Sequence, residues 1–401
     1  MKIIERTEYI DQLKRVVGTP DIKVITGIRR SGKSKLMLTF IDYLNKNYKN
    51  INIVYIDYNL SKYEDLTNKD SLYEYVSEHY DKKKKNFLMI DEIELCENFE
   101  KVVISLYTEG KYDIYLTGSN AFLLSSDLVT LFTGRTFEIQ VFPFSFKEYL
   151  QYYKYKNLNE AFDRFVLEGG MSGSYLYKDI RDKYKNINDI YKTLLLRDIK
   201  QKYKIKHIET FNRISEYLIS NISNIVSINN VQKAIKQSGS NIDYKTVAKY
   251  IEYLLSAFIF YKVTRYDLSG KKYLKTNEKY YLADHVFKYA VLGTKNMNYG
   301  YTYENIVAIE LLRRGYEIYI GILYKKEIDF IAIKKDEQLF IQVCDDISAE
   351  KTFSREVAPL LSIKSGYKKM ILANTKHDMY QYEGIEIHDI ARWLEDIEGK
   401  E

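Results

Sequence analysis

Short apolar runs alternate with longer segments of helical spacing over the first third of the chain. The runs are rich in β-branched and aromatic residues, which is typical of buried strands. Apolar positions at helical spacing follow the first run, across residues 35–44. Alternation of this kind predicts a parallel sheet with helices on both faces. The predicted strands are residues 23–26, 51–57, 87–90, 113–117 and 137–141.

The pattern changes after residue 143. A helical, tyrosine-rich stretch follows and is interrupted at Gly169-Gly170. Three amphipathic helices and a hairpin come next, and the last stretch mixes helices and strands. The three helices are predicted at 211–222, from Ser227 to Gln237, and at 244–256, and the hairpin at 259–265 and 272–282. These changes divide the chain into residues 1–143, 144–206, 207–285 and 286–401.

A phosphate-binding loop follows the first predicted strand. The segment matches G-x-x-x-x-G-K-[ST] at every fixed position, and it consists of Gly27, Ile28, Arg29, Arg30, Ser31, Gly32, Lys33 and Ser34. Backbone N–H groups in such a loop surround phosphate oxygens, and the helix that follows adds the positive end of its dipole. Lys33 is expected to reach the β- and γ-phosphates of ATP, and Ser34 to offer its hydroxyl to Mg²⁺.

Paired acids end the third predicted strand. Asp91 and Glu92 follow the apolar run at residues 87–90, at the sheet edge where an open α/β sheet binds its ligand. Asp91 is expected to hold Mg²⁺, and Glu92 to orient or deprotonate the attacking water. Such acids are common after buried strands, and it is the phosphate loop some 60 residues earlier that favours this interpretation.

Three further residues are candidates for the same site. Ser119 and Asn120 follow the fourth predicted strand and would touch the γ-phosphate or the attacking water, or else form a turn and a helix cap. Arg135 precedes the fifth strand and would stabilise the transferring phosphoryl group from the same or a neighbouring subunit, unless it is a surface arginine. Arg29 and Arg30 would serve electrostatically, and the sequence does not distinguish them.

Composition limits the remaining classes of function. The chain has 401 residues, of which 61 are Lys or Arg and 55 are Asp or Glu, a net charge of +6 that permits nucleic-acid contact without requiring it. Its two cysteines, Cys96 and Cys344, form no disulfide framework, which favours the cytoplasm. No signal-peptide core is evident at the first residues, and the longest apolar stretch, residues 254–261, is too short to span a bilayer. We therefore expect no membrane partner.

Taken together, these segments resemble the prokaryotic AAA-type ATPases with a C-terminal domain of unknown function. The resemblance covers essentially the whole chain and includes Thr117-Gly118-Ser119, Gly134-Arg135, the run from Val141 to Tyr149, the Gly-Gly turn at 168–171, where Met171-Ser172 departs from the family pattern, and residues 197–199. It implies a core that binds ATP and hydrolyses it. It also implies that residues 3–6 lie near the adenine.

The three helices and the hairpin within residues 207–285 predict a winged helix, and the partner of this winged-helix segment has two open interpretations. Its third helix is predicted to bury Tyr244, Val247, Ile251 and Leu254 on one face, with Ser227 and Asp243 capping the second and third helices. Lys245, Lys249 and Lys262 would be available to DNA. The third helix is not strongly basic, however, so a protein partner is equally open.

The last segment resembles restriction-endonuclease-like domains in its order of helix, strand and strand. Those domains use an Asp on one strand and Glu-x-Lys on the next to hold Mg²⁺ and activate water. Glu304 and Asp329 match carboxylate positions, but Gln342 replaces the Glu and Cys344 the Lys. Asp345 and Asp346 are out of register for the same strand face. We therefore predict the fold without nuclease chemistry.

The predicted architecture is thus an α/β P-loop ATPase core with a helical lid, a winged helix and a restriction-endonuclease-like domain. The predicted function is an ATP-hydrolysing switch whose C-terminal modules contact DNA or a protein, and which can assemble as a homo-oligomer. Two alternatives stay open. One is a nucleotide-gated adaptor with negligible hydrolysis, and the other is an ATP-gated nuclease.

Overall fold

The computed structural model describes residues 4–118, 134–270, 272–295, 298–324 and 326–395. They form two compact units. The N-terminal unit comprises the described residues up to Val141 together with Ser256–Phe258, and the C-terminal unit comprises Phe142–Leu255 and the residues from Ile259 onward. None of the helices in these ranges is long and apolar enough to cross a bilayer.

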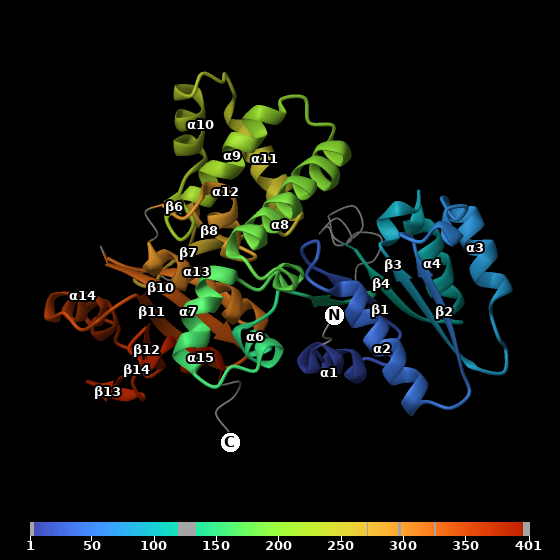
Figure 1. The fold of residues 1–401 in the computed structure, drawn as a ribbon, viewed down its shortest axis with the longest axis horizontal. Coiled ribbons are helices and arrows are strands. Elements are labelled where there is room, and N and C mark those ends of the chain that lie inside the picture. Colours follow the sequence, from blue (N-terminus) through green and yellow to red (C-terminus); the bar gives the residue numbers. More distant parts are fainter. Residues whose placement is uncertain (1–3, 119–133, 271, 296–297, 325, 396–401) are drawn as a thin grey trace. The chain divides into compact units, whose positions relative to one another are not determined.

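The N-terminal unit is built on a parallel sheet with the strand order β2-β3-β4-β1-β5 in the described residues (Figure 1). Its strands are β1 (Ile22–Thr26), β2 (Ile51–Asp57), β3 (Lys85–Asp91), β4 (Asp113–Thr117) and β5 (Thr136–Gln140). The predicted parallel α/β sheet is confirmed, and each strand lies within two residues of its predicted position. The helices around it are α1 (Thr7–Arg15), α2 (Lys33–Asn47), α3 (Lys69–Glu78) and α4 (Phe99–Glu109).

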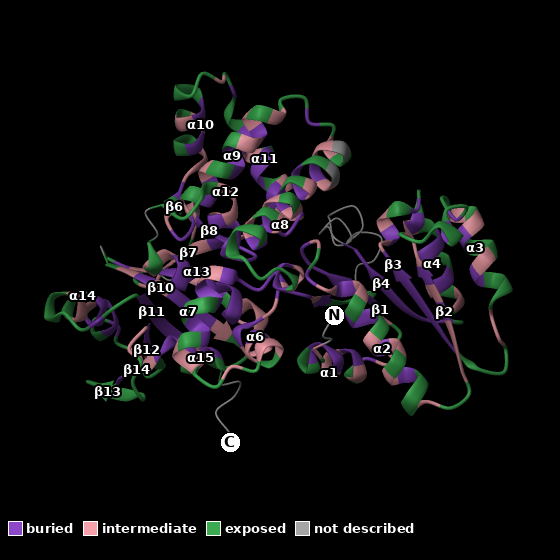
Figure 2. Ribbon diagram, viewed as in Figure 1, coloured by how far each residue is buried: buried purple, intermediate pink, exposed green. Residues whose placement is uncertain are grey.

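Helices cover both faces of this sheet because consecutive strand residues are buried on opposite sides. In β3, Leu88 and Ile90 pack with the core that includes α3 and α4, whereas Phe87 and Met89 pack with α1 and α2. Figure 2 shows these inner strands buried. A strand covered on both faces is a near-continuous apolar run, which is the pattern that the sequence carries.

One lysine is an exception to that apolar interior. Lys23, in β1, is 0% exposed, and its Nζ lies 2.6 Å from Asp113 Oδ1 and 2.6 Å from the Thr19 carbonyl oxygen. Asp113 begins β4 and also accepts a 2.7 Å hydrogen bond from the Gly18 N–H. This buried ion pair lies at the edge of the sheet where β1 and β4 begin.

Lys23→Met is expected to lower the free energy of unfolding of the N-terminal unit by about 3–5 kcal/mol, because it leaves the Asp113 carboxylate buried without its cation. The only tryptophan of the chain, Trp393, lies in the C-terminal unit. Denaturant unfolding should therefore shift in circular dichroism while the tryptophan-emission transition stays in place. Lys14→Met, which removes a partly exposed pair with Asp11, is the control. An equal loss in both variants would contradict the prediction.

The C-terminal unit contains a mixed sheet with the order β13-β14-β12-β11-β10-β9-β7-β8-β6 in its described residues. Core side chains show that α14 covers one face, and that α6, α7, α13 and α15 cover the other. The strands are β6 (Ile225–Val226), β7 (Phe260–Asp267), β8 (Lys272–Leu282), β9 (Glu317–Leu323), β10 (Lys326–Lys334), β11 (Glu337–Cys344), β12 (Lys368–Ala373), β13 (Tyr380–Tyr382) and β14 (Ile385–Asp389). The helices are α6 (Phe146–Tyr153), α7 (Leu158–Glu168), α8 (Ile180–Thr193), the π-helix η5 (Leu194–Gln201), α9 (Ile208–Ser220), α10 (Ile228–Gln237), α11 (Tyr244–Ser256), α12 (Val286–Leu292), α13 (Tyr299–Arg313), α14 (Glu350–Leu361) and α15 (Ile390–Glu395). Short 3₁₀ segments also occur in the two units, at Ser61–Tyr63, Ile93–Leu95 and Ser172–Leu176.

The predicted helices and hairpin of the winged-helix segment are present as α9, α10, α11 and β7–β8. Ser227 accepts a hydrogen bond from the Asn230 N–H at 3.1 Å, and Asp243 accepts one from the Thr246 N–H at 2.9 Å, so both predicted caps are confirmed. The predicted buried face of α11 is wrong at Tyr244, which is 47% exposed. The hairpin is also part of the larger sheet, because β7 pairs in parallel with β9.

Candidate functional site

The loop between β1 and α2 has a backbone that only certain residues can adopt. Gly27 and Gly32 have φ values of 133° and 101°, and Arg30 has a φ of 68°. A Cβ on Gly27 would lie 2.1 Å from the Val141 carbonyl oxygen, so no larger residue fits at that position. The glycines of the motif are therefore required by the turn itself, which is followed directly by the first turn of α2.

Lys33 begins α2 and turns its side chain back over the loop. Its Nζ donates to the carbonyl oxygens of Gly27 and Ile28, at 2.9 and 3.2 Å. Burial lowers the pKa of Lys33, and the carboxylates of Glu92, Glu94 and Asp91 oppose that shift. The ammonium thus lies inside the loop, where phosphate oxygens would replace the two carbonyls as its partners.

Asp91 ends β3 beside this loop and is 0% exposed. Its Oδ1 accepts a hydrogen bond from the Thr117 hydroxyl, whereas its Oδ2 is buried without a hydrogen-bond partner among the described residues. Burial raises the pKa of Asp91, and hydrogen bonding by Thr117 and then Ser34 opposes the shift. A buried carboxylate oxygen without a partner, next to a hydroxyl, is a donor set that fits a hard cation such as Mg²⁺.

Glu92 has a left-handed backbone, with φ 57° and ψ 49°. Its N–H donates to the Thr117 hydroxyl oxygen at 3.0 Å. Thr117 therefore joins the two acids: it accepts from the backbone of Glu92 and donates to the side chain of Asp91. Its position at the end of β4 is the signal by which it could have been found, because the ends of neighbouring parallel strands meet at one edge.

Arg135 lies elsewhere. It is exposed, its carbonyl oxygen accepts from the Ile22 N–H at 2.8 Å, and its guanidinium lies 5.6 Å from the centre of the Tyr107 ring. Ile22 begins β1, whereas the phosphate loop follows the other end of that strand, roughly 16 Å away for five residues. This position contradicts a role within the same subunit, and it leaves two of the predicted alternatives open: a role in a neighbouring subunit, or a surface arginine.

The other predicted residues are distributed as follows. Ser119 and Asn120 lie outside the described residues. Within the loop, Arg29 is half-buried and Arg30 is exposed. Arg6 is 6% exposed, and its Nη1 donates to the Ser31 carbonyl oxygen at 2.9 Å, so the segment before α1 contacts the phosphate loop.

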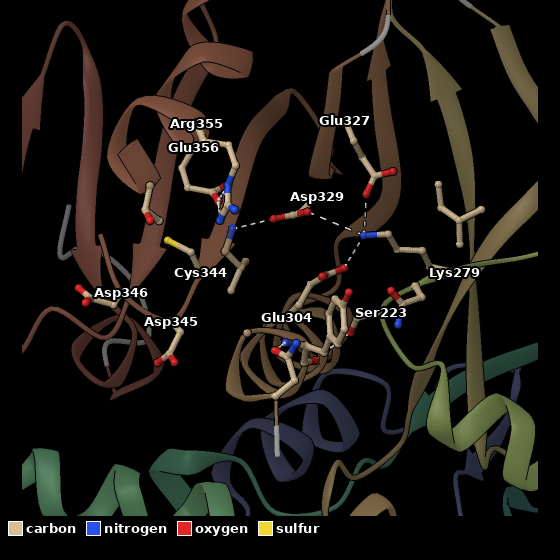
Figure 3. A pocket seen from close by; sticks show the side chains of 17 residues that line it. Ser223, Lys279, Glu304, Glu327, Asp329, Cys344, Asp345, Asp346, Arg355 and Glu356 are labelled. Atoms are coloured by element: carbon tan, nitrogen blue, oxygen red, sulfur yellow. Dashed lines mark hydrogen bonds and ion pairs between the residues drawn. The ribbon is translucent and has the colours of Figure 1, made fainter. Parts of the chain in front are cut away.

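The acids predicted in the C-terminal unit also come together, around a lysine that the sequence did not single out. Lys279 Nζ lies 2.8 Å from Glu304 Oε1 and 3.8 Å from Asp329 Oδ1 (Figure 3). Gln342 is hydrogen bonded to two of the neighbouring acids. Its Oε1 accepts from the Asp329 N–H, and its Nε2 donates to Glu356. Cys344 is buried.

Among the lysines predicted to face DNA, Lys245 and Lys249 are exposed on α11. Lys262 is exposed on β7 and lies 3.3 Å from Glu252.

Two parts of the chain match known protein families. Residues 19–150 match a family described as an AAA domain, and residues 159–298 match a domain of unknown function. A protein of Haemophilus influenzae, described as uncharacterized, is 34% identical over 397 residues, which is 98% of each chain. An uncharacterized protein of Methanocaldococcus jannaschii is 27% identical, over 96% of this chain and 88% of its own length.

One solved structure is also similar in fold. It is described as a Walker-type ATPase of Pyrococcus abyssi, and it is 16% identical with a TM-score of 0.52, over 72% of this chain and 95% of its own. At this identity the likeness supports the fold of the core and no finer detail.

Proposed function

We propose that this chain, which belongs to the same protein family as the Haemophilus influenzae relative and carries an AAA domain at residues 19–150, is an ATP-binding and ATP-hydrolysing molecular switch. The observation that carries the proposal is the buried, unpartnered Oδ2 of Asp91 beside a complete phosphate loop. A buried carboxylate oxygen without a partner is costly. A cation that accompanies a triphosphate would remove that cost.

Each residue of the site has a role in this proposal. The backbone of residues 27–33 binds the phosphates, and the Lys33 ammonium neutralises charge on the β- and γ-phosphates. Ser34 and Asp91 hold Mg²⁺, which supplies further neutralisation of charge on the phosphates when bound. Glu92 orients the attacking water and accepts its proton. Thr117 keeps the two acids in position through its two hydrogen bonds.

We further infer that the C-terminal unit transmits the nucleotide state to a partner, either DNA or a protein. The exposed Lys245 and Lys249 on α11 support DNA, but they are few. An arginine supplied by a neighbouring subunit would require assembly. Gel filtration with and without a non-hydrolysable ATP analogue tests that assembly, and phosphate release with and without duplex DNA tests the partner.

Asp91→Asn tests the site most directly. The variant should weaken Mg²⁺-dependent ATP binding by about tenfold or more, since it removes a charged ligand of the metal, and nucleotide binding in EDTA should change little. Asp57→Asn is the matched control, because Asp57 ends β2 at the position that pairs with Asp91 in the sheet. Equal effects of the two substitutions, or an equal loss in EDTA, would contradict the assignment.

A further inference from the structure

A hollow in the C-terminal unit has a volume of about 680 Å³, and acids are the commonest charged residues that line it (Figure 3). It lies where β8, α13 and β10 meet the end of β11 and α14. Six carboxylates and two cations face it: Glu304, Glu327, Asp329, Asp345, Asp346, Glu356, Lys279 and Arg355. Arg355 pairs with Glu356 at 2.7 Å, so Lys279 is the cation that faces the remaining acids.

Lys279 contacts three carboxylates that come from two other elements. Its Nζ is 2.8 Å from Glu304 Oε1 on α13, 2.9 Å from Glu327 Oε1 and 3.8 Å from Asp329 Oδ1, the last two on β10. The side chain is 4% exposed. Burial lowers the pKa of Lys279, but the three carboxylates outweigh burial and hold its pKa above the usual value. The three nearby carboxylates therefore favour the charged form of this lysine.

Two of the carboxylates that contact Lys279 also accept a hydrogen bond from another group. Glu304 Oε1 also accepts from the Tyr281 hydroxyl at 2.7 Å, and Asp329 Oδ2 accepts from the Val343 N–H at 2.8 Å. Burial and the charge of Glu304 raise the pKa of Asp329 to about 8, and Lys279 opposes them. Removing the ammonium would leave these acids buried together without a counter-charge, which is strongly unfavourable.

We propose that the Lys279 ammonium is the built-in cation of this pocket: it takes the place that a hard divalent metal would occupy among Glu304, Glu327 and Asp329, and the pocket binds no metal. Two observations fit this role. Across the described residues, no group of three or more His, Cys, Asp or Glu side chains is arranged to hold a metal ion. The Gln342 amide, at the position where restriction-endonuclease-like domains have a Glu, is hydrogen bonded to the Asp329 N–H and to Glu356.

The ion cluster around Lys279 also joins separate elements of the sheet. Because Lys279 is on β8 and its partners are on α13 and β10, the ion cluster ties the β7–β8 hairpin to the C-terminal strands. This consequence does not rest on the ATPase proposal, because the cluster lies entirely within the C-terminal unit.

The test is a Mn²⁺ titration of nucleotide-free protein, followed by electron paramagnetic resonance. All variants carry Asp91→Asn, so that the candidate nucleotide site does not contribute. The parent should show no Mn²⁺ binding that depends on Glu304. Lys279→Met should gain a site roughly a hundredfold tighter than any in the parent, because a positive charge has been removed from among the carboxylates. Adding Glu304→Gln should abolish that gain.

Two results would overturn the proposal. One is Mn²⁺ binding by the parent that Glu304→Gln removes, because the pocket would then hold a metal beside Lys279. The other is a Lys279→Met variant that gains no site. The first arm needs no substitution at Lys279, so it decides the question even if Lys279→Met fails to fold. Lys262→Met, on exposed Lys262 of the neighbouring strand, controls for a general loss of positive charge.

A stability measurement gives an independent reading. The emission of Trp393 reports the C-terminal unit, and its melting midpoint in Lys279→Met should fall by on the order of 10 °C. Mn²⁺ should restore part of the loss in this variant and leave the parent unchanged. A midpoint that Mn²⁺ raises equally in both proteins would count against a cation supplied by the chain.

Discussion

Glu92→Gln is expected to reduce the kcat of ATP hydrolysis by about 10²–10⁴-fold, the usual contribution of a positioned general base. The amide keeps the size of the side chain and can still hold a water, but it cannot accept the proton. The Kd for ATP should change little, because Glu92 contacts no phosphate in the proposed site. Phosphate release at saturating ATP measures the first quantity, and equilibrium binding of a fluorescent ATP analogue measures the second.

The control for this experiment is Glu97→Gln, an exposed acid five residues further along the chain. It should behave as the wild type in both assays. If Glu92→Gln released phosphate at the wild-type rate, Glu92 would not be the base. If the variant instead lost ATP binding, the substitution would have changed the backbone at residue 92 and with it the shape of the neighbouring phosphate loop.

Lys33→Ala should instead act mainly on the binding of ATP. A charge-assisted hydrogen bond contributes about 1.5–3 kcal/mol, so the Kd for ATP should rise by roughly 10- to 150-fold. The Lys33 ammonium is also hydrogen bonded to the Gly27 and Ile28 carbonyls within the loop. Part of the effect could therefore come from a change in the loop itself.

Lys33→Met tests the contribution of side-chain volume, because it keeps most of the length but lacks, as alanine does, both the charge and the two hydrogen bonds to the loop. The two variants should lose affinity for ATP equally if the charge matters most. Lys35→Ala, two residues further on the exposed side of α2, should leave the Kd unchanged. An unchanged Kd in Lys33→Ala would remove the phosphate-loop assignment.

The nucleotide-binding unit could be predicted well because its signals are local. The strands of the sheet are buried on both faces, so each is a short apolar run that stands out by itself. The loop is specified by contiguous residues, and Asp91 follows a strand directly. Contacts between side chains of different strands were harder to predict. The role of Thr117 depends on the strand order, which brings it beside Asp91, 26 positions earlier.

The environments of four residues did not follow from the sequence, because they depend on distant partners, on strand direction or on exposure at the end of a helix. Lys23 begins the predicted strand at residues 23–26, and its full burial depends on Asp113, 90 residues later. Lys279 belonged to a predicted hairpin, and its acids lie in a segment assigned to another domain. Arg135 was placed by its order in sequence, whereas the direction of a parallel strand sends it to the far edge. Tyr244 fits the helical spacing of the apolar residues in α11, but it is the first residue of that helix and is 47% exposed.

The tight approach of Gly27 to Val141 has a mechanical consequence. Val141 is the last residue of the N-terminal unit before the chain enters the other unit, and its N–H also donates to the Thr26 carbonyl oxygen at 2.8 Å. Gly27, the first residue of the phosphate loop, and Val141, the last residue of the unit, are therefore held in close contact. A displacement of Gly27 would therefore press on the backbone of Val141, at the point where the chain leaves the N-terminal unit.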